Sequence, residues 1–109
     1  MIKGIGIDII EIERIEKLIS NKPNFLERNF TMPEREQNAK PETIAGNFAA
    51  KEAFAKALGT GFRGFNLIDI EVLRNHLGAP YIIFRGEPTN ANVSISHNRS
   101  TAVAVVVLT

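Results

Sequence analysis

The spacing of apolar positions changes several times along the chain, and each change predicts a new element. From residue 2 to 9, isoleucine alternates with Lys, Gly and Asp, which is the two-residue period of a strand. From 9 to about 20, apolar residues recur at helical spacing among Glu, Arg and Lys. Residues 21–24 break this helix, and 25–30 follow as a helical turn. Thr31 is then expected to cap a short polar helix that ends near Ala39.

An alanine-rich stretch at residues 47–58 predicts the body of a longer helix, since Ala, Leu, Lys and Glu favour helices. Pro41 sits just before it and Gly59 follows its last apolar residue, as helix starts and ends favour. Its apolar residues cover more than one stripe, which predicts a buried helix. Glu52 and Lys56 nevertheless stand on it, four residues apart among alanines. These charges need an explanation.

The second half of the chain predicts strands at 67–73, 81–84, 91–97 and 101–108, with turns at 75–80, 87–90 and 98–100. The last strand is apolar on both faces, so both faces must be covered. So short a chain has few helices to cover them, and we expect a homo-oligomer. The element order predicts an α+β fold, with an N-terminal strand and helices around one long central helix, packed on an antiparallel sheet.

Composition narrows the class of protein. A length of 109 residues predicts a single domain, 1–109. A hydrophobic content of 44% and a charged content of 23% are typical of soluble globular proteins, and a net charge of +1 gives no general attraction to nucleic acid or membranes. There is no cysteine, no signal-peptide layout, and no apolar run long enough to span a bilayer. We expect a cytoplasmic protein.

Several familiar sites are excluded by context. Residues 59–64 match the dinucleotide-binding pattern GxGxxG, but they follow a helix and precede a strand, the reverse of what that mechanism needs. No Walker A sequence and no GxSxG elbow occur. Two histidines without cysteine argue against a zinc site.

The remaining polar residues suit a phosphate ligand. Asp8 and Glu52 are carboxylates flanked by glycine or alanine, and magnesium commonly takes one or two protein carboxylates plus water and phosphate oxygens. Lys56 lies one turn beyond Glu52, placed to contact phosphate oxygens. Residues 59–61 offer backbone N–H groups that can form an anion nest. His97 ends its strand at a hairpin where a ligand could bind.

Each of these residues also has a structural alternative. Asp8 and Glu11 could form a capping pair for the next helix. Glu52 and Lys56 could form an ordinary i,i+4 ion pair worth about 0.2–0.5 kcal/mol. Lys51 is expected to face solvent, and His97 could bond a backbone carbonyl. On the residues alone, the prediction stops at an α+β oligomer with a candidate phosphate site.

Three stretches together resemble holo-acyl-carrier-protein synthase, the short bacterial class of 4′-phosphopantetheinyl transferase. They are residues 4–15, residues 47–61 with the core Phe-Ala-Ala-Lys-Glu-Ala-Phe, and residues 93–97. The resemblance implies the 4′-phosphopantetheinyl transferase fold and transfer of the 4′-phosphopantetheine arm of coenzyme A to a serine of apo-acyl carrier protein, in fatty acid biosynthesis. Adenosine 3′,5′-bisphosphate would be released. It also implies a homotrimer with active sites between subunits. The alternatives are the same chemistry on another carrier domain, or a non-catalytic module that binds coenzyme A or the carrier.

Carried over by position, the resemblance implies that Asp8 and Glu52 bind Mg²⁺, and that Glu52 or a metal-bound water takes the serine proton. The implied catalytic residues are Asp8, Glu52, Lys56 and His97. The residues implied to bind coenzyme A are Lys51, Lys56, Gly59, Gly61 and His97. The residues implied to dock the acidic carrier are Arg14, Phe25 and Arg28. Nine of the thirteen Lys and Arg residues precede Phe62, which fits an acidic partner.

The chain departs from the family pattern at a few positions. Asn47 stands where arginine is usual, Ala79 where lysine is common, and Thr101 where an aromatic residue is usual. Asn47 would remove one cationic contact to the nucleotide phosphates. We interpret these differences as changes in affinity or carrier choice, with the reaction type kept.

Overall fold

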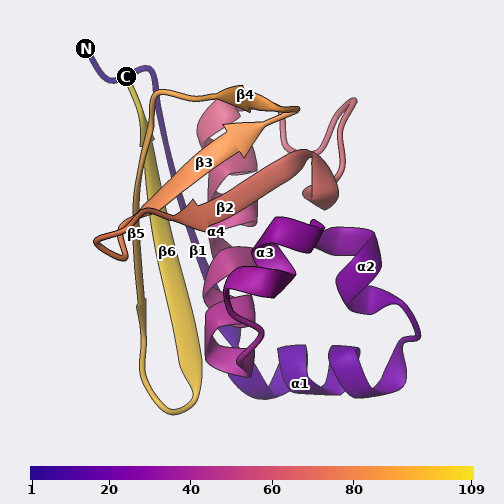
Figure 1. Ribbon diagram of the computed structural model, residues 1–109. Helices are drawn as coiled ribbons and strands as arrows, with labels where there is room; N and C mark the ends of the chain where they lie inside the picture. Colours follow the sequence, from indigo (N-terminus) through magenta and orange to yellow (C-terminus); the bar gives the residue numbers. More distant parts are fainter.

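The computed structural model describes residues 1–109 as four α-helices, one 3-10 turn and two three-stranded antiparallel sheets, which confirms the α+β class (Figure 1). One sheet has the order β1-β6-β5 and the other β2-β3-β4. The elements are β1 (Gly4–Glu11), α1 (Ile12–Asn21), α2 (Phe25–Asn29), α3 (Met32–Gln37), α4 (Pro41–Leu58), η1 (Leu67–Asp69), β2 (Ile70–Arg74), β3 (Pro80–Phe84), β4 (Glu87–Pro88), β5 (Ala91–His97) and β6 (Thr101–Leu108).

Helix α4 is the 18-residue element against which the rest of the chain packs, and its alanine-rich sequence explains how. Eleven of its residues are buried, six of them alanines that let neighbouring elements approach closely. Pro41 occupies its first turn, and Gly59 ends it in a left-handed conformation with φ 81°. The expected helix and its glycine cap are therefore confirmed. Figure 1 shows sheet β1-β6-β5 on one side of α4 and helices α1 to α3 on the other.

The glycines of β1 serve backbone packing. A Cβ on Gly6 would lie 1.9 Å from the carbonyl oxygen of Ala53, and one on Gly4 would lie 2.0 Å from that of Ala57. Only glycine permits this contact between strand and helix. Because strand side chains alternate, Asp8 lies on the same α4-facing side of β1, two residues beyond Gly6.

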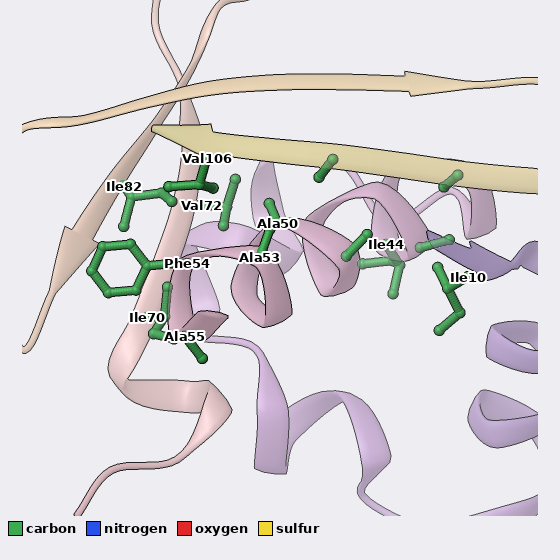
Figure 2. Close-up of a cluster of buried hydrophobic side chains, with 14 of the residues drawn as sticks. Ile10, Ile44, Ala50, Ala53, Phe54, Ala55, Ile70, Val72, Ile82 and Val106 are labelled. Carbon is green, nitrogen blue, oxygen red and sulfur yellow. The ribbon is translucent and has the colours of Figure 1, made fainter. Parts of the chain in front are cut away.

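The hydrophobic core lies between α4 and both sheets. Phe54 packs there near Ile70, Val72 and Ile82 of the second sheet and Val106 of β6 (Figure 2). The aromatic ring of Phe54 lies 5.4 Å from that of Phe84, centre to centre. This core fixes α4 against β1 and β6, the two elements that flank its charged residues.

The other face of the first sheet is apolar and open. Ile5, Ile7 and Ile9 of β1 are 64%, 60% and 68% exposed. Their partners on the neighbouring strand β6 are Val107, Val105 and Val103, which are only partly buried. The alternation predicted for β1 is therefore confirmed, and one of the two apolar faces of β6 lacks a cover within this chain.

Some predicted bounds are wrong for local reasons. The strand continues to Glu11, so the first helix begins at Ile12 and not at Ile9. The expected strand at 67–73 begins only at Ile70, because Asp69 accepts a hydrogen bond from the backbone N–H of Asn66 and holds residues 67–69 in a 3-10 turn. The expected single antiparallel sheet is two sheets, and the predicted turn at 87–90 contains β4.

None of the helices combines the length and the apolar character that crossing a membrane requires.

Candidate active site on helix α4

Asp8 and Lys56 meet where β1 crosses α4. The ammonium of Lys56 lies 3.2 Å from Asp8 Oδ1 and donates a 2.8 Å hydrogen bond to the carbonyl oxygen of Ile7. The Lys56 side chain stays 55% exposed and that of Asp8 19%, so the pair borders solvent. Two structural alternatives are thereby wrong. Lys56 pairs with Asp8 instead of Glu52, and Glu11 stands at the N-cap of α1 without a side-chain cap bond.

Glu52 faces the same place from α4. Partial burial raises its pKa, and the nearby negative charge of Asp8 raises it further, while Lys56 and Arg14 act in the opposite direction. Arg14 is on α1, so this helix contributes a positive charge that acts on Glu52. The structure therefore joins Asp8, Glu52, Lys56 and Arg14, although the sequence assigned Arg14 to carrier docking alone.

The two carboxylates suit a hard cation. Asp8 raises the pKa of Glu52, so a positive ion between them would relieve their mutual repulsion. No cluster of three or more His, Cys, Asp or Glu residues exists in the chain. A site with two protein carboxylates fits Mg²⁺, which fills its other positions with water and phosphate oxygens.

Lys51 does not face solvent, and the prediction that it binds coenzyme A is wrong. Its side chain is 0% exposed and pairs with the equally buried Glu34 at 2.8 Å. The ammonium also donates to the carbonyl oxygens of Asn29 at 2.6 Å and Leu67 at 3.1 Å. Three acceptors use all three of its protons, which leaves none for a ligand. Burial lowers the pKa of Lys51, and the carboxylate of Glu34 opposes that shift.

The glycine loop after α4 is open. Gly59 and Gly61 have positive φ of 81° and 62°, and no atom lies within 4 Å of a Cβ built on either. The N–H of Gly59 is already bonded to the carbonyl oxygen of Lys56 as the helix cap. A nest for an anion at this loop would therefore rely on Thr60 and Gly61.

His97 lies away from the carboxylates within one chain. It is exposed at the end of β5, with Nδ1 3.4 Å from the carbonyl oxygen of Asn98. It lines depressions beside Glu42, near the start of α4, ten residues and about 15 Å along the helix axis from Glu52. Strand β6 also separates it from Asp8, which adds two inter-strand spacings, about 10 Å. The predicted four-residue site is therefore not assembled by a single chain.

The residues predicted to dock a carrier lie on α1 and α2. Arg14 and Arg28 are exposed, and Phe25 is half-buried, with its ring stacked 6.5 Å from that of Phe48 on α4. Phe25 and Arg28 border a surface depression with Lys22, while Arg14 borders another with Lys17. Glu11 and Glu13 line the depression at Arg14 as well, so this surface is mixed in charge.

Asn47 is buried at 3% exposure, and its Oδ1 has no hydrogen-bond partner. Its amide carries no charge, so this position offers no cationic contact.

Sequence and fold comparisons place the chain in a family. Residues 4–107 match the family model of the 4′-phosphopantetheinyl transferase superfamily. The chain is 51% identical to holo-[acyl-carrier-protein] synthase of Clostridium botulinum (strain Alaska E43 / Type E3) over 120 residues, covering 99% of this chain and 98% of that protein. The chain belongs to the holo-acyl-carrier-protein synthase family. A second relative, from Alkaliphilus oremlandii, is 52% identical over 95% of this chain and 96% of its own.

Solved structures agree with this membership. The fold matches the holo-(acyl-carrier-protein) synthase of Bacillus anthracis str. Ames in complex with CoA (3′,5′-ADP), with a TM-score of 0.84, 44% identity, and coverage of 99% of this chain and 96% of that one. The Helicobacter pylori enzyme in complex with coenzyme A matches with a TM-score of 0.85 and 37% identity, covering 96% and 99%. The resemblance of the three sequence stretches is confirmed, and the protein is a phosphopantetheinyl transferase.

Proposed function

We propose that this protein transfers the 4′-phosphopantetheine arm of coenzyme A to a serine of apo-acyl carrier protein at the site formed by Asp8, Glu52 and Lys56. The observation that carries the proposal is the meeting of two carboxylates and a partly exposed lysine where β1 crosses α4. The match to a relative solved with CoA (3′,5′-ADP) supports the donor. The names of the relatives support the acceptor.

In the proposed reaction, the serine Oγ attacks the phosphorus that carries the pantetheine arm. The bond from that phosphorus to the bridging oxygen breaks, and adenosine 3′,5′-bisphosphate leaves with the bond electrons. Glu52 takes the serine proton, because partial burial and the charge of Asp8 raise its pKa and so make its carboxylate a stronger base than an ordinary one. Lys56 donates hydrogen bonds to phosphate oxygens, for which its half-exposed ammonium needs only to exchange partners.

Asp8 and Glu52 are the residues that would hold Mg²⁺. When bound, the ion would neutralise charge that develops on the pyrophosphate oxygens. Before substrate binds, the ammonium of Lys56 offsets the charge of Asp8 at a distance of 3.2 Å. With the charge of Asp8 balanced by the ion, the ammonium of Lys56 would be available to phosphate oxygens.

The open apolar face of sheet β1-β6-β5 supports a homotrimer. Three isoleucines more than half exposed in a row, beside three valines, form a surface that soluble monomers rarely leave uncovered. Because β1 is an edge strand of this sheet, a neighbouring copy that covers the open face could also reach past β1 to Asp8 and Glu52 on the other side. We propose that His97 reaches the site from such a neighbour, since it lies too far away within its own chain.

The surface of α1 and α2 that carries Arg14, Phe25 and Arg28 is the proposed docking site for the acidic carrier. Arg14 acts on Glu52 electrostatically, so this surface adjoins the proposed reaction centre. Arg28 and Phe25 extend it along α2. Complementary charge would speed the encounter and favour an acidic carrier over others.

Product analysis tests the proposed reaction. With Mg²⁺, coenzyme A and apo-acyl carrier protein, adenosine 3′,5′-bisphosphate is expected to form in a 1:1 ratio to modified carrier, as measured by liquid chromatography. Release without a carrier would mean hydrolysis instead of transfer. Faster reaction with a peptidyl carrier domain than with acyl carrier protein would change the acceptor and leave the chemistry intact.

A further inference from the structure

The buried pair of Lys51 and Glu34 joins more segments than any other polar contact in the chain. Glu34 Oε1 accepts from Lys51 and from the backbone N–H of Thr31 at 2.9 Å, while Oε2 accepts from the backbone N–H of Val72, also at 2.9 Å. Lys51 adds the end of α2 and the start of η1, through the carbonyl oxygens of Asn29 and Leu67. Two side chains thus tie α2, α3, η1 and β2 to α4.

Stability alone does not account for such a pair. Removing two charges from water is costly, and apolar residues of similar size often stabilise a core equally well or better. An apolar side chain in place of Lys51 could pack against the ring of Phe30, whose centre lies 4.4 Å from the ammonium. A buried ion pair does supply directional contacts, which fix where the bonded segments lie.

The fixed segments are those on which the proposed reaction depends. Lys51 precedes Glu52 directly, so the two side chains leave α4 in different directions, one into the core and the other toward Asp8. The acceptor of its shortest bond is the carbonyl of Asn29, the residue after Arg28. The amide of Asn29 in turn donates to the carbonyl oxygen of Phe25 at 2.9 Å. A short chain of bonds thus runs from α4 to the α2 docking surface.

We propose that the Lys51–Glu34 pair positions the carrier-docking helix α2 relative to Glu52, so that a docked carrier presents its serine at the site of transfer. This inference rests on the proposed function. Lys51 and Glu34 are positioning residues, since neither has an exposed atom that could touch either substrate. Loss of the pair should weaken productive docking of the carrier and leave coenzyme A binding nearly unchanged.

The test compares the two substrates in Lys51→Met, which removes the donors but keeps a long apolar chain beside Phe30. At a temperature where circular dichroism shows the variant folded, we expect KM for apo-acyl carrier protein to rise at least about tenfold, a change typical of a lost positioning contact. The Kd of coenzyme A, measured by calorimetry, should change less than about threefold. An unchanged carrier KM, or equal losses for both substrates, would overturn the proposal.

A double-variant cycle separates positioning from loss of stability. If Lys51 acts through α2, then Arg28→Ala should raise the carrier KM much less in the Lys51→Met background than in the wild-type protein. The proposal would be contradicted if the carrier KM of the double variant rose by the product of the two single-variant factors. Glu34→Gln is the second variant, because it removes the charge and keeps an oxygen acceptor. Failure of both variants to fold would assign the pair to stability alone. The proposed function is checked separately by the wild-type protein. If the wild-type protein transfers the group, these outcomes bear on the positioning role alone.

Discussion

Lys56 reaches from α4 to Asp8 on β1, with 3.2 Å between its ammonium and Asp8 Oδ1, and leaves Glu52 one turn away without a paired cation. A lysine in the middle of an alanine-rich helix would ordinarily be a solvated charge. Here it connects the helix to the one carboxylate on the glycine side of β1. The contact brings together residues 48 positions apart in the sequence and defines the site from which the proposed chemistry follows.

The closeness of β1 to α4 is the first feature to test, because it places Asp8. Gly6→Ala would put a Cβ 1.9 Å from the carbonyl oxygen of Ala53. We expect a loss of about 3 kcal/mol or more in the free energy of unfolding, the upper end for forced overpacking, measured by urea denaturation.

Gly46→Ala is the matched control for Gly6→Ala. Its Cβ would meet one side-chain methyl of Ile95, at 2.8 Å, so that side chain must shift, whereas the clash at Gly6 is with backbone. Alanine also favours the helix over glycine by about 1 kcal/mol, which offsets part of that cost, so the loss should be clearly smaller than for Gly6→Ala. Equal stability of Gly6→Ala and the wild-type protein would contradict the described packing.

The raised pKa of Glu52 predicts a pH-dependent cost in stability. Below its ordinary pKa the carboxyl is protonated in both the folded and unfolded states, and it costs nothing. As pH rises through the raised pKa, the folded state must carry a disfavoured charge, so stability is lost. Glu52→Gln should therefore unfold at higher urea than the wild-type protein at pH 7 in the absence of Mg²⁺.

This difference should shrink toward pH 4, and also on addition of Mg²⁺, which would stabilise only the wild-type protein. Glu13→Gln is the control, because Glu13 is an exposed partner of Lys17 at 3.2 Å. Its effect should stay within about 0.5 kcal/mol at either pH. Lower stability of Glu52→Gln at pH 7 would show that the charge of Glu52 is stabilising after all.

The apolar face of the first sheet predicts an assembly that a charge can break. Ile7→Asp places a carboxylate in the middle of that face, where Ile7 is 60% exposed. Light scattering should report a trimer for the wild-type protein and a monomer for the variant. Leu77→Asp is the control, since Leu77 is 81% exposed in the turn between β2 and β3, outside this sheet, and should leave the trimer intact. A monomeric wild-type protein with full activity would contradict the shared site.

Mixed oligomers test whether His97 acts across subunits. Glu52→Gln and His97→Ala should each be inactive alone. When the two are refolded together in equal amounts, one site in four pairs an intact Glu52 with an intact His97 from the neighbour. The mixture should then regain about a quarter of wild-type activity. No recovery would mean that both residues serve the same site from one chain.

The sequence predicted what depends on local pattern. Helix α4 and its end at Gly59 follow from alanine content and a glycine cap. Thr31 caps α3 as predicted, and the structure adds a capping box with Glu34. The resemblance added the importance of Asp8, Glu52 and Lys56, which periodicity alone left as an ion pair or a cap.

Long-range partners could not be predicted in the same way. Lysine is normally exposed, and Lys51 is buried because Glu34, seventeen residues earlier, returns to meet it. Lys56 pairs with Asp8 and not with Glu52 because Gly4 and Gly6 let β1 pack closely against α4. The distance of His97 from the carboxylates reflects strand order, which alternation does not reveal.

The most direct test of the central claim is the intact mass of the carrier after reaction. With Mg²⁺, coenzyme A and the wild-type protein, apo-acyl carrier protein should gain the mass of one 4′-phosphopantetheine group, on its serine. Asp8→Ala and Glu52→Ala should each reduce the rate by at least about a hundredfold, the lower range for a lost catalytic group, and should keep the circular dichroism of the fold. No mass gain with the wild-type protein at any Mg²⁺ concentration would contradict the account, and full activity in either variant would contradict the assigned site.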